Sequence, residues 1–208
     1  MKHMSTFLPP ETVEMLASVG PQFPDKLAFD TDMTILFSDM RGFTELSERY
    51  EPRTVYAAIN ASLAVQTRLV LEHKGTVNKF LGDGLLACFS GEDRTVRAVR
   101  CVMDMLQFLQ QREAEQISLP SPVGFGINDG RVLFGLLGTA ERREFSVIGD
   151  VVNTAARLCG IAQPFHALIT EAALAMLPAD MAARHCRFHC RQQFKGKSSP
   201  MQVYRIEE

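Results

Sequence analysis

Two aspartates stand where a strand-like stretch meets a glycine-containing turn. Asp39 lies near the end of the apolar run MTILFSDM (33–40) and is followed by Gly42, whereas Asp83 lies in a Gly-Asp-Gly turn between two apolar runs. Carboxylates held at strand ends beside glycines can approach one another and leave room for phosphate oxygens and hard divalent cations. Each aspartate alone is more simply explained by turn chemistry, in which Asp is common. The pair predicts a cation site only if the fold brings the two turns together.

The elements that would position these aspartates alternate between strand and helix patterns. The run that ends at Asp39 is typical of a short buried strand, and 76–89 (TVNKFLGDGLLACF) is typical of a β-hairpin because Asp-Gly separates two apolar runs. A long amphipathic helix is predicted between Pro52 and Gly75, where Val55, Ile59, Leu63 and Val70 recur at helical spacing.

The second half of the chain continues this alternation. A helix is predicted over about 92–112, followed by two strands about a turn at 129–131 (Asp-Gly-Arg), and a helix over 151–161 with Asp150 as its N-cap. Shorter strands and a helix at 171–177 complete the chain. This order predicts an α+β sandwich of the ferredoxin-like, split βαβ (βαββαβ) type, with helices packed on one face of a largely antiparallel sheet.

Composition sets limits on the protein class. The chain has 208 residues, 46% of them hydrophobic and 22% charged, which is enough for one globular domain. A net charge of -2 argues against a nucleic-acid partner. The chain has no apolar run long enough to cross a bilayer and no secretory signal pattern. Its five cysteines include no CxxC pair, so we expect reduced thiols and a cytoplasmic domain.

Residues 1–30 differ from the rest of the chain. They hold four of the ten prolines around one short helical stretch, Glu11 to Ser18, and are interpreted as a lead-in or linker. The remainder, 31–208, is interpreted as a single domain. A regulatory or membrane-anchoring domain upstream in a longer parent protein is compatible with this division.

Four segments, taken in order, resemble one family. FSDMRGFT (37–44), KFLGDGLLACF (79–89), FSVIGDVVNTAARL (145–158) and FKGK (194–197) occur in the same order and at similar intervals as in the class III nucleotidyl cyclases, specifically the adenylate cyclase type. The resemblance covers nearly the whole chain from Met33 to Ile206. It implies conversion of a nucleoside triphosphate to its 3′,5′-cyclic monophosphate with release of pyrophosphate.

The resemblance also implies a metal site and a phosphate-binding turn. Asp39 and Asp83 match the two aspartates that hold two Mg2+ or Mn2+ ions in the family. Main-chain amides of the turn Met40, Arg41, Gly42 and Phe43 are expected to contact phosphate, as backbone donors near glycine often do.

Two further positions match the residues that select the base in this family. Lys79 is a donor only, which suits adenine N1 and is mismatched to guanine N1. Ser146 can accept from the adenine 6-amino group, but a hydroxyl also donates, so it discriminates less than a carboxylate would. Guanylate cyclases typically carry Glu and Cys at these places. The expected substrate is therefore ATP, with GTP as the alternative.

The remaining matched residues would act on the ribose and the phosphates. Asn153 and Arg157 are four positions apart and would project from one helix face. The resemblance implies that Asn153 orients the ribose and Arg157 stabilises charge on the α-phosphate. Lys195 matches the phosphate-binding lysine, with Lys197 as a second candidate, and Arg142 or Arg143 could add a phosphate contact.

The family arrangement implies a homodimer with two shared active sites. The metal carboxylates would come from one chain, and the residues that bind base, ribose and phosphate from its partner. Two alternatives remain: a catalytically inactive module that binds nucleotide, and zinc binding at RHCRFHC (184–190), whose spacing fits no common zinc pattern.

Overall fold

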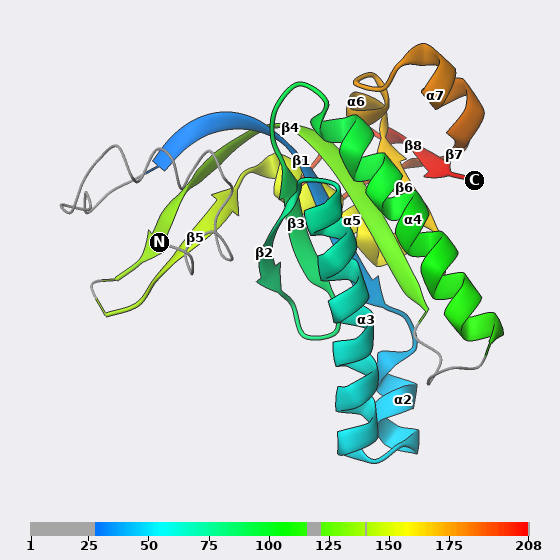
Figure 1. Cartoon of the computed structure of the whole chain (residues 1–208). Helices are drawn as coiled ribbons and strands as arrows, with labels where there is room; N and C mark the ends of the chain where they lie inside the picture. Colours follow the sequence, from blue (N-terminus) through cyan, green and yellow to red (C-terminus); the bar gives the residue numbers. More distant parts are fainter. Residues whose placement is uncertain (1–27, 116–121, 140, 208) are drawn as a thin grey trace.

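The computed structural model describes residues 28–115, 122–139 and 141–207. In these ranges the chain forms a mixed sheet covered by helices (Figure 1). The predicted helical stretch Glu11–Ser18 and nearly all of the predicted lead-in lie outside the described residues. The strands are β1 (Ala28–Met40), β2 (Thr76–Phe80), β3 (Leu85–Phe89), β4 (Val123–Gly138), β5 (Arg143–Ile148), β6 (Ala167–Thr170), β7 (Cys186–Gln192) and β8 (Met201–Ile206). The helices are α2 (Phe43–Arg49), α3 (Pro52–Glu72), α4 (Arg94–Ala114), α5 (Asp150–Ile161), α6 (Glu171–Leu174) and α7 (Ala179–His185).

The sheet has the order β2-β3-β1-β4-β6-β8-β7, with β5 paired to β4. Its pairings are antiparallel except that of β4 with β6. The predicted α+β sandwich with a largely antiparallel sheet is confirmed, and so are the long helix after Pro52 and the β2–β3 hairpin.

The helices cover both faces of the sheet, so the expectation of helices on one face only is wrong. Alternate residues of β1 divide between two cores: Leu36 packs with α3 and α4, whereas Ile35 packs in the core that contains Ala155 of α5. Helix α5 lies close to the sheet, because a Cβ at Gly126 would lie 2.3 Å from Ala155 O. This close packing fixes α5 relative to β4.

The predicted turn at 129–131 is also wrong, because β4 runs through it as one strand. Gly130 has φ +150°, a conformation that glycine adopts readily, and it still pairs with Met33 of β1. On one side of it Asp129 is buried and forms an ion pair with Arg94 (Nε–Oδ1 2.7 Å). Pairing with β1 on both sides of Gly130 keeps the strand continuous. The outer part of β4 and strand β5 extend away from the helices (Figure 1).

None of the described helices is both long and apolar enough to span a membrane. The cysteines are free thiols, and burial raises the pKa of Cys88 to about 12. In the part of the chain that the structure describes, no three or more His, Cys, Asp or Glu side chains are arranged to hold a metal ion, and this includes the segment 184–190. There, Cys186 is buried and the ring of His185 lies 3.1 Å from the carbonyl oxygen of Glu207. The structure therefore gives no support to zinc at this segment.

Candidate active site

The end of β1 and the tip of the β2–β3 hairpin meet and bring the two aspartates together. The last residue pair between β1 and β3 joins Ser38 to Leu85. Asp39 is the residue after Ser38, and Asp83 lies two residues before Leu85. The approach requires glycine, because a Cβ at Gly84 would lie 1.9 Å from Ser38 O. We call Asp39, Asp83 and the backbone between them the carboxylate corner.

The electrostatics of the carboxylate corner favour a positive charge. Partial burial raises the pKa of Asp83, and the negative charge of Asp39 raises it further. Backbone N–H groups, including that of Met40, and the nearby Arg41 act in the opposite direction. Two carboxylates that repel each other at a partly buried position are stabilised by a cation.

The donor set fits a magnesium or manganese ion. Mg2+ binds through oxygen, keeps several water molecules and commonly uses one or two carboxylates together with substrate phosphates. The carboxylate corner offers two carboxylates, and no larger group of candidate ligands is found among the described residues. Asp39 keeps 45% of its side-chain surface exposed, which leaves it open to a ligand.

The turn after Asp39 offers fewer amides than the sequence predicts. The Arg41 amide donates to Pro122 O (2.7 Å) and the Met40 amide donates to Asp83, so neither is free to bind phosphate. Gly42 has φ +73° and is the N-cap of helix α2, whose first-turn amides, including that of Phe43, lack partners within the helix. The expected phosphate donors therefore reduce to Gly42 and Phe43.

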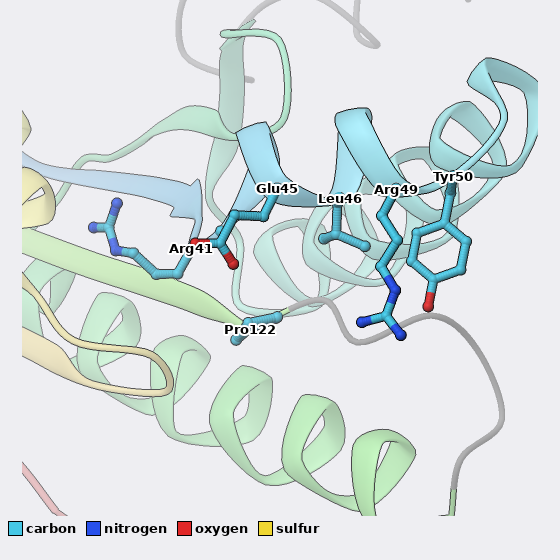
Figure 2. A pocket seen from close by; sticks show the side chains of 7 residues that line it. Arg41, Glu45, Leu46, Arg49, Tyr50 and Pro122 are labelled. Atoms are coloured by element: carbon cyan, nitrogen blue, oxygen red, sulfur yellow. The ribbon is translucent and has the colours of Figure 1, made fainter.

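Two open cavities adjoin this turn. The larger, of about 570 Å³, is lined mainly by α3 and also by Phe43, Phe80 and Asp83. The smaller, of about 290 Å³, lies beside α2 (Figure 2). Figure 2 shows the Arg41 side chain extending away from Glu45 and Arg49. Asp83 of the carboxylate corner therefore lies at the larger cavity.

The expected base-selecting residues lie on β2 and β5. Lys79 Nζ is 2.5 Å from Glu144 Oε1, and Asn78 Nδ2 donates to the carbonyl oxygen of Phe145 (3.1 Å). Hydrogen bonding to Lys79 lowers the pKa of Glu144. Ser146 is buried, with 4% of its surface accessible, whereas 28% of the Lys79 side chain is exposed. Lys79 is therefore the more accessible of the two.

Glu144 was not anticipated from the sequence. It stands two positions before Ser146 on the same face of β5, and strand alternation is the signal that could have found it. Its carboxylate and the ammonium of Lys79 place an acceptor beside a donor. We call Lys79, Glu144 and Ser146 the β2–β5 face.

Helix α5 carries Asn153 and Arg157, as predicted. Asn153 is exposed and Arg157 is half-buried. Asp150 is not the N-cap: that position is Gly149, and Asp150 forms an ion pair with Lys197 instead.

The segment 194–197 runs past the same helix. A Cβ on Gly196 would lie 4.0 Å from Arg157 Nη2, so this segment passes close to the guanidinium. Lys195 is exposed and has no ion pair with any residue that the structure describes, whereas Lys197 is held by Asp150. Lys195 is thus the better placed of the two lysines to meet a ligand. Arg142 is exposed in the loop before β5, and Arg143, the first residue of β5, donates from Nε to Thr139 O (3.2 Å).

The predicted site residues form separate groups within one chain. In the described ranges, no hydrogen bond or ion pair joins Asp39 or Asp83 to Lys79, Asn153, Arg157 or Lys195. A single chain therefore presents a carboxylate corner and a second set of polar groups on β2, β5 and α5, with no direct bond between the two sets of proposed site residues in the described ranges.

Comparisons with known proteins agree with this geometry. Residues 28–208 match the family model described as the adenylate and guanylate cyclase catalytic domain. An adenylate cyclase of Anabaena cylindrica is 30% identical over 97% of this chain and 42% of its own length. A terminal-differentiation-specific adenylate cyclase of Dictyostelium discoideum is 27% identical over 98% of this chain and 10% of its own length. The chain therefore spans less than half of these curated relatives.

Solved structures give the same result. The adenylyl cyclase CyaB from P. aeruginosa superposes with a TM-score of 0.79 at 29% identity, covering 88% of this chain and 96% of that one. The guanylyl cyclase Cya2 superposes with a TM-score of 0.77, also at 29% identity, covering 86% of this chain and 93% of that one. From the carboxylate corner, the sandwich around it and these matches together, we conclude that the chain belongs to the family of adenylate and guanylate cyclase catalytic domains.

Proposed function

We propose that this domain is an adenylate cyclase that converts ATP to 3′,5′-cyclic AMP and pyrophosphate at sites shared by two copies of the chain. The observation that carries the proposal is the carboxylate corner, in which Asp39 and Asp83 meet at the edge of an open cavity. In the reaction, the ribose 3′-oxygen bonds to the α-phosphorus, the bond from that phosphorus to the β-phosphate oxygen breaks, and the hydroxyl proton passes to solvent.

Asp39 and Asp83 would hold two Mg2+ or Mn2+ ions. When bound, such ions neutralise the triphosphate and make the ribose hydroxyl more acidic. The amides of Gly42 and Phe43 would orient a phosphate group, since they open onto the same turn. These groups bind and align the triphosphate.

Residues of the other group would serve the rest of the nucleotide. Arg157 would stabilise negative charge on the α-phosphate, Asn153 would orient the ribose, and Lys195 would bind the departing pyrophosphate. Lys79 would donate to adenine N1, and the hydroxyl of Ser146 would accept from the 6-amino group.

A homodimer would join the two groups. Because no hydrogen bond or ion pair among the described residues links Asp39 or Asp83 to Arg157 or Lys195, a head-to-tail pair would complete each site with residues from both copies. Exposed apolar side chains on the extended β4–β5 region, Leu133, Leu137 and Ile148, offer contact surface for a second copy.

A guanylate cyclase is the second candidate. The hydroxyl of Ser146 can donate as well as accept. The guanylyl cyclase Cya2 is also as similar in sequence to this chain as the adenylyl cyclase CyaB, at 29% identity each. Incubation with ATP or GTP and Mn2+, followed by chromatographic identification of the product, separates the candidates. Cyclic AMP from ATP is expected. Cyclic GMP alone would favour the second candidate, and no product from either nucleotide would favour an inactive module.

Complementation tests the shared site. Asp39→Ala and Arg157→Ala should each be inactive alone, whereas a mixture should recover activity through heterodimers with one intact site. Asp180→Asn, at an exposed ion pair with Arg184, is the matched control and should stay active. No recovery from folded variants that exchange partners would contradict the shared site.

A further inference from the structure

The side chain of Arg41 joins the carboxylate corner to helix α5. Its Nη1 donates to Asp39 Oδ2 (2.5 Å), its Nε donates to Ala162 O (2.8 Å), and its Nη2 donates to Cys159 O. Carbonyls in the last turn of a helix lack intrahelical donors, and a cation there is favoured by the helix dipole. One guanidinium therefore binds two carbonyl oxygens at the end of α5, of which that of Cys159 also accepts from the Ala162 amide, and one oxygen of Asp39.

The guanidinium of Arg41 occupies the space left by the missing side chain of Gly124. A Cβ on Gly124 of β4 would lie 2.6 Å from Arg41 Nη2, so any larger residue would displace the arginine. The Arg41 side chain is 19% exposed, compared with 45% for Asp39. The arginine is thus enclosed between β4 and α5, while the carboxylate that it contacts stays open.

We infer that Arg41 is a positioning residue, which fixes the Asp39 carboxylate and the end of α5 in one arrangement. This inference rests on the proposed function for its meaning in catalysis. The fork of the guanidinium is required, because three acceptors lie in different directions and a lysine ammonium is a single point of charge. Oδ1 of Asp39 is left to face a cation.

In a dimer with shared sites, this contact would act on both active sites. Asp39 of a chain would serve one site, whereas Asn153 and Arg157 on α5 of the same chain would serve the other. Arg41 would therefore set the geometry of metal binding in one site and of phosphate binding in the second.

Three variants test the positioning role without relying on turnover. Arg41→Gln removes the charge and Arg41→Lys keeps it without the fork. Gly124→Ala keeps the arginine but displaces it, and it should fold because the crowded atoms are the end of a flexible side chain. Binding of Mn2+ alone is followed by electron paramagnetic resonance, and the end of α5 is followed by hydrogen exchange.

All three variants should bind Mn2+ about 10–100-fold more weakly, as is typical when a partner of a metal ligand is lost. Exchange at 158–162 should be faster in each. Arg68→Lys and Arg68→Gln, at an exposed pair with Glu72, are matched controls and should change neither readout. If Arg41→Lys matches the wild type while Arg41→Gln does not, charge alone acts and the inference is wrong; unchanged binding and exchange in all three also overturn it.

Heterodimers separate the two contacts of Arg41. A mixture of Asp39→Ala and Arg157→Ala chains has one complete site, built from the carboxylates of the second chain and α5 of the first. Arg41→Gln added to the Arg157→Ala chain should raise the Mn2+ concentration needed for activity. The same change in the Asp39→Ala chain should lower kcat with no change in the Mn2+ requirement.

No effect in either position would overturn the inference. If the unmodified mixture is inactive, the shared site of the proposed function fails instead. The Mn2+ titrations and the exchange rates of the single variants then still decide the role of Arg41.

Discussion

The carboxylate corner and the β2–β5 face are built in different ways. Backbone pairing and the close approach of Gly84 to Ser38 set the corner, so its geometry follows from the fold itself. Side-chain contacts set the β2–β5 face, where a half-exposed ion pair joins Lys79 to Glu144. The carboxylates that would carry out the chemistry common to the family are then positioned by backbone pairing. The side chains that would select the base are positioned by contacts that can change at little cost to stability.

Asp83→Asn should have the largest effect. Turnover should fall by roughly 10³-fold or more, because the change removes one of the two carboxylates proposed to hold metal, and each 1.36 kcal/mol is a factor of ten. The melting temperature of the metal-free protein should stay the same or rise. The raised pKa means that the folded chain binds this proton more tightly than the unfolded chain. Ionised Asp83 therefore destabilises the fold, and the penalty disappears as pH falls through the raised pKa.

Turnover assays and thermal melts without metal check both expectations. A variant with lower stability and full activity would show that Asp83 is a structural turn residue and not a ligand.

Gly84→Ala should have the second-largest effect, because it disturbs the close backbone contact between Gly84 and Ser38 in the carboxylate corner. The added methyl group would meet the carbonyl oxygen of Ser38, and we expect a loss of about 1–3 kcal/mol in unfolding free energy together with weaker Mn2+ binding. Gly160→Ala, at a helical glycine with no atom within 4 Å of an added Cβ, should be neutral or stabilising. Equal stability of the two variants in urea titrations would mean that the corner is not held by this close approach.

Lys79→Glu combined with Ser146→Cys should change the choice of base while leaving the fold intact. The kcat/KM for ATP should fall by about 10–100-fold, which corresponds to the 1–3 kcal/mol of a good base contact, and GTP should improve relative to ATP. Mn2+ binding without nucleotide should be unchanged, since Lys79 forms its ion pair with Glu144 and no hydrogen bond or ion pair among the described residues joins it to Asp39 or Asp83. An unaltered ATP to GTP ratio would show that these side chains do not contact the base.

Glu144→Gln should have the smallest effect. Its ion pair is half-exposed, and such pairs contribute less than about 1 kcal/mol. The lowered pKa of Glu144 means that its contribution is present at neutral pH and is lost as pH falls through the folded pKa. Melts of wild type and variant should therefore differ slightly at pH 7 and converge in acid. A gap that widens in acid would contradict the assignment of this pair.

Local patterns predicted much of the fold and the outline of the corner. The hairpin with its Asp-Gly pair and the helix between Pro52 and Gly75 follow from turn chemistry and periodicity, which are properties of neighbouring residues. The turn expected at 129–131 failed because Asp-Gly is also compatible with a strand whose partner pairs on both sides, and that partner, β1, lies far away in sequence.

Side-chain partners could not be predicted in the same way. The pairing of Lys79 with Glu144, the burial of Ser146 and the use of the Arg41 amide by Pro122 all depend on segments brought together by the sheet. Asp150 was expected to cap α5, but Lys197, from a distant loop, provides its ion pair instead. The order of the motifs identified these residues as candidate site residues, but it did not predict which side chains they contact.

The long ladder between β1 and β4 limits how such a domain can be switched. Every residue from Ala28 to Met40 is paired with β4, and the last of them adjoin the corner. Sliding one strand along the other by a single residue would turn each inward side chain outward. In the proposed dimer, regulation would therefore tilt one whole copy against the other, and Asp39 would move together with the sheet.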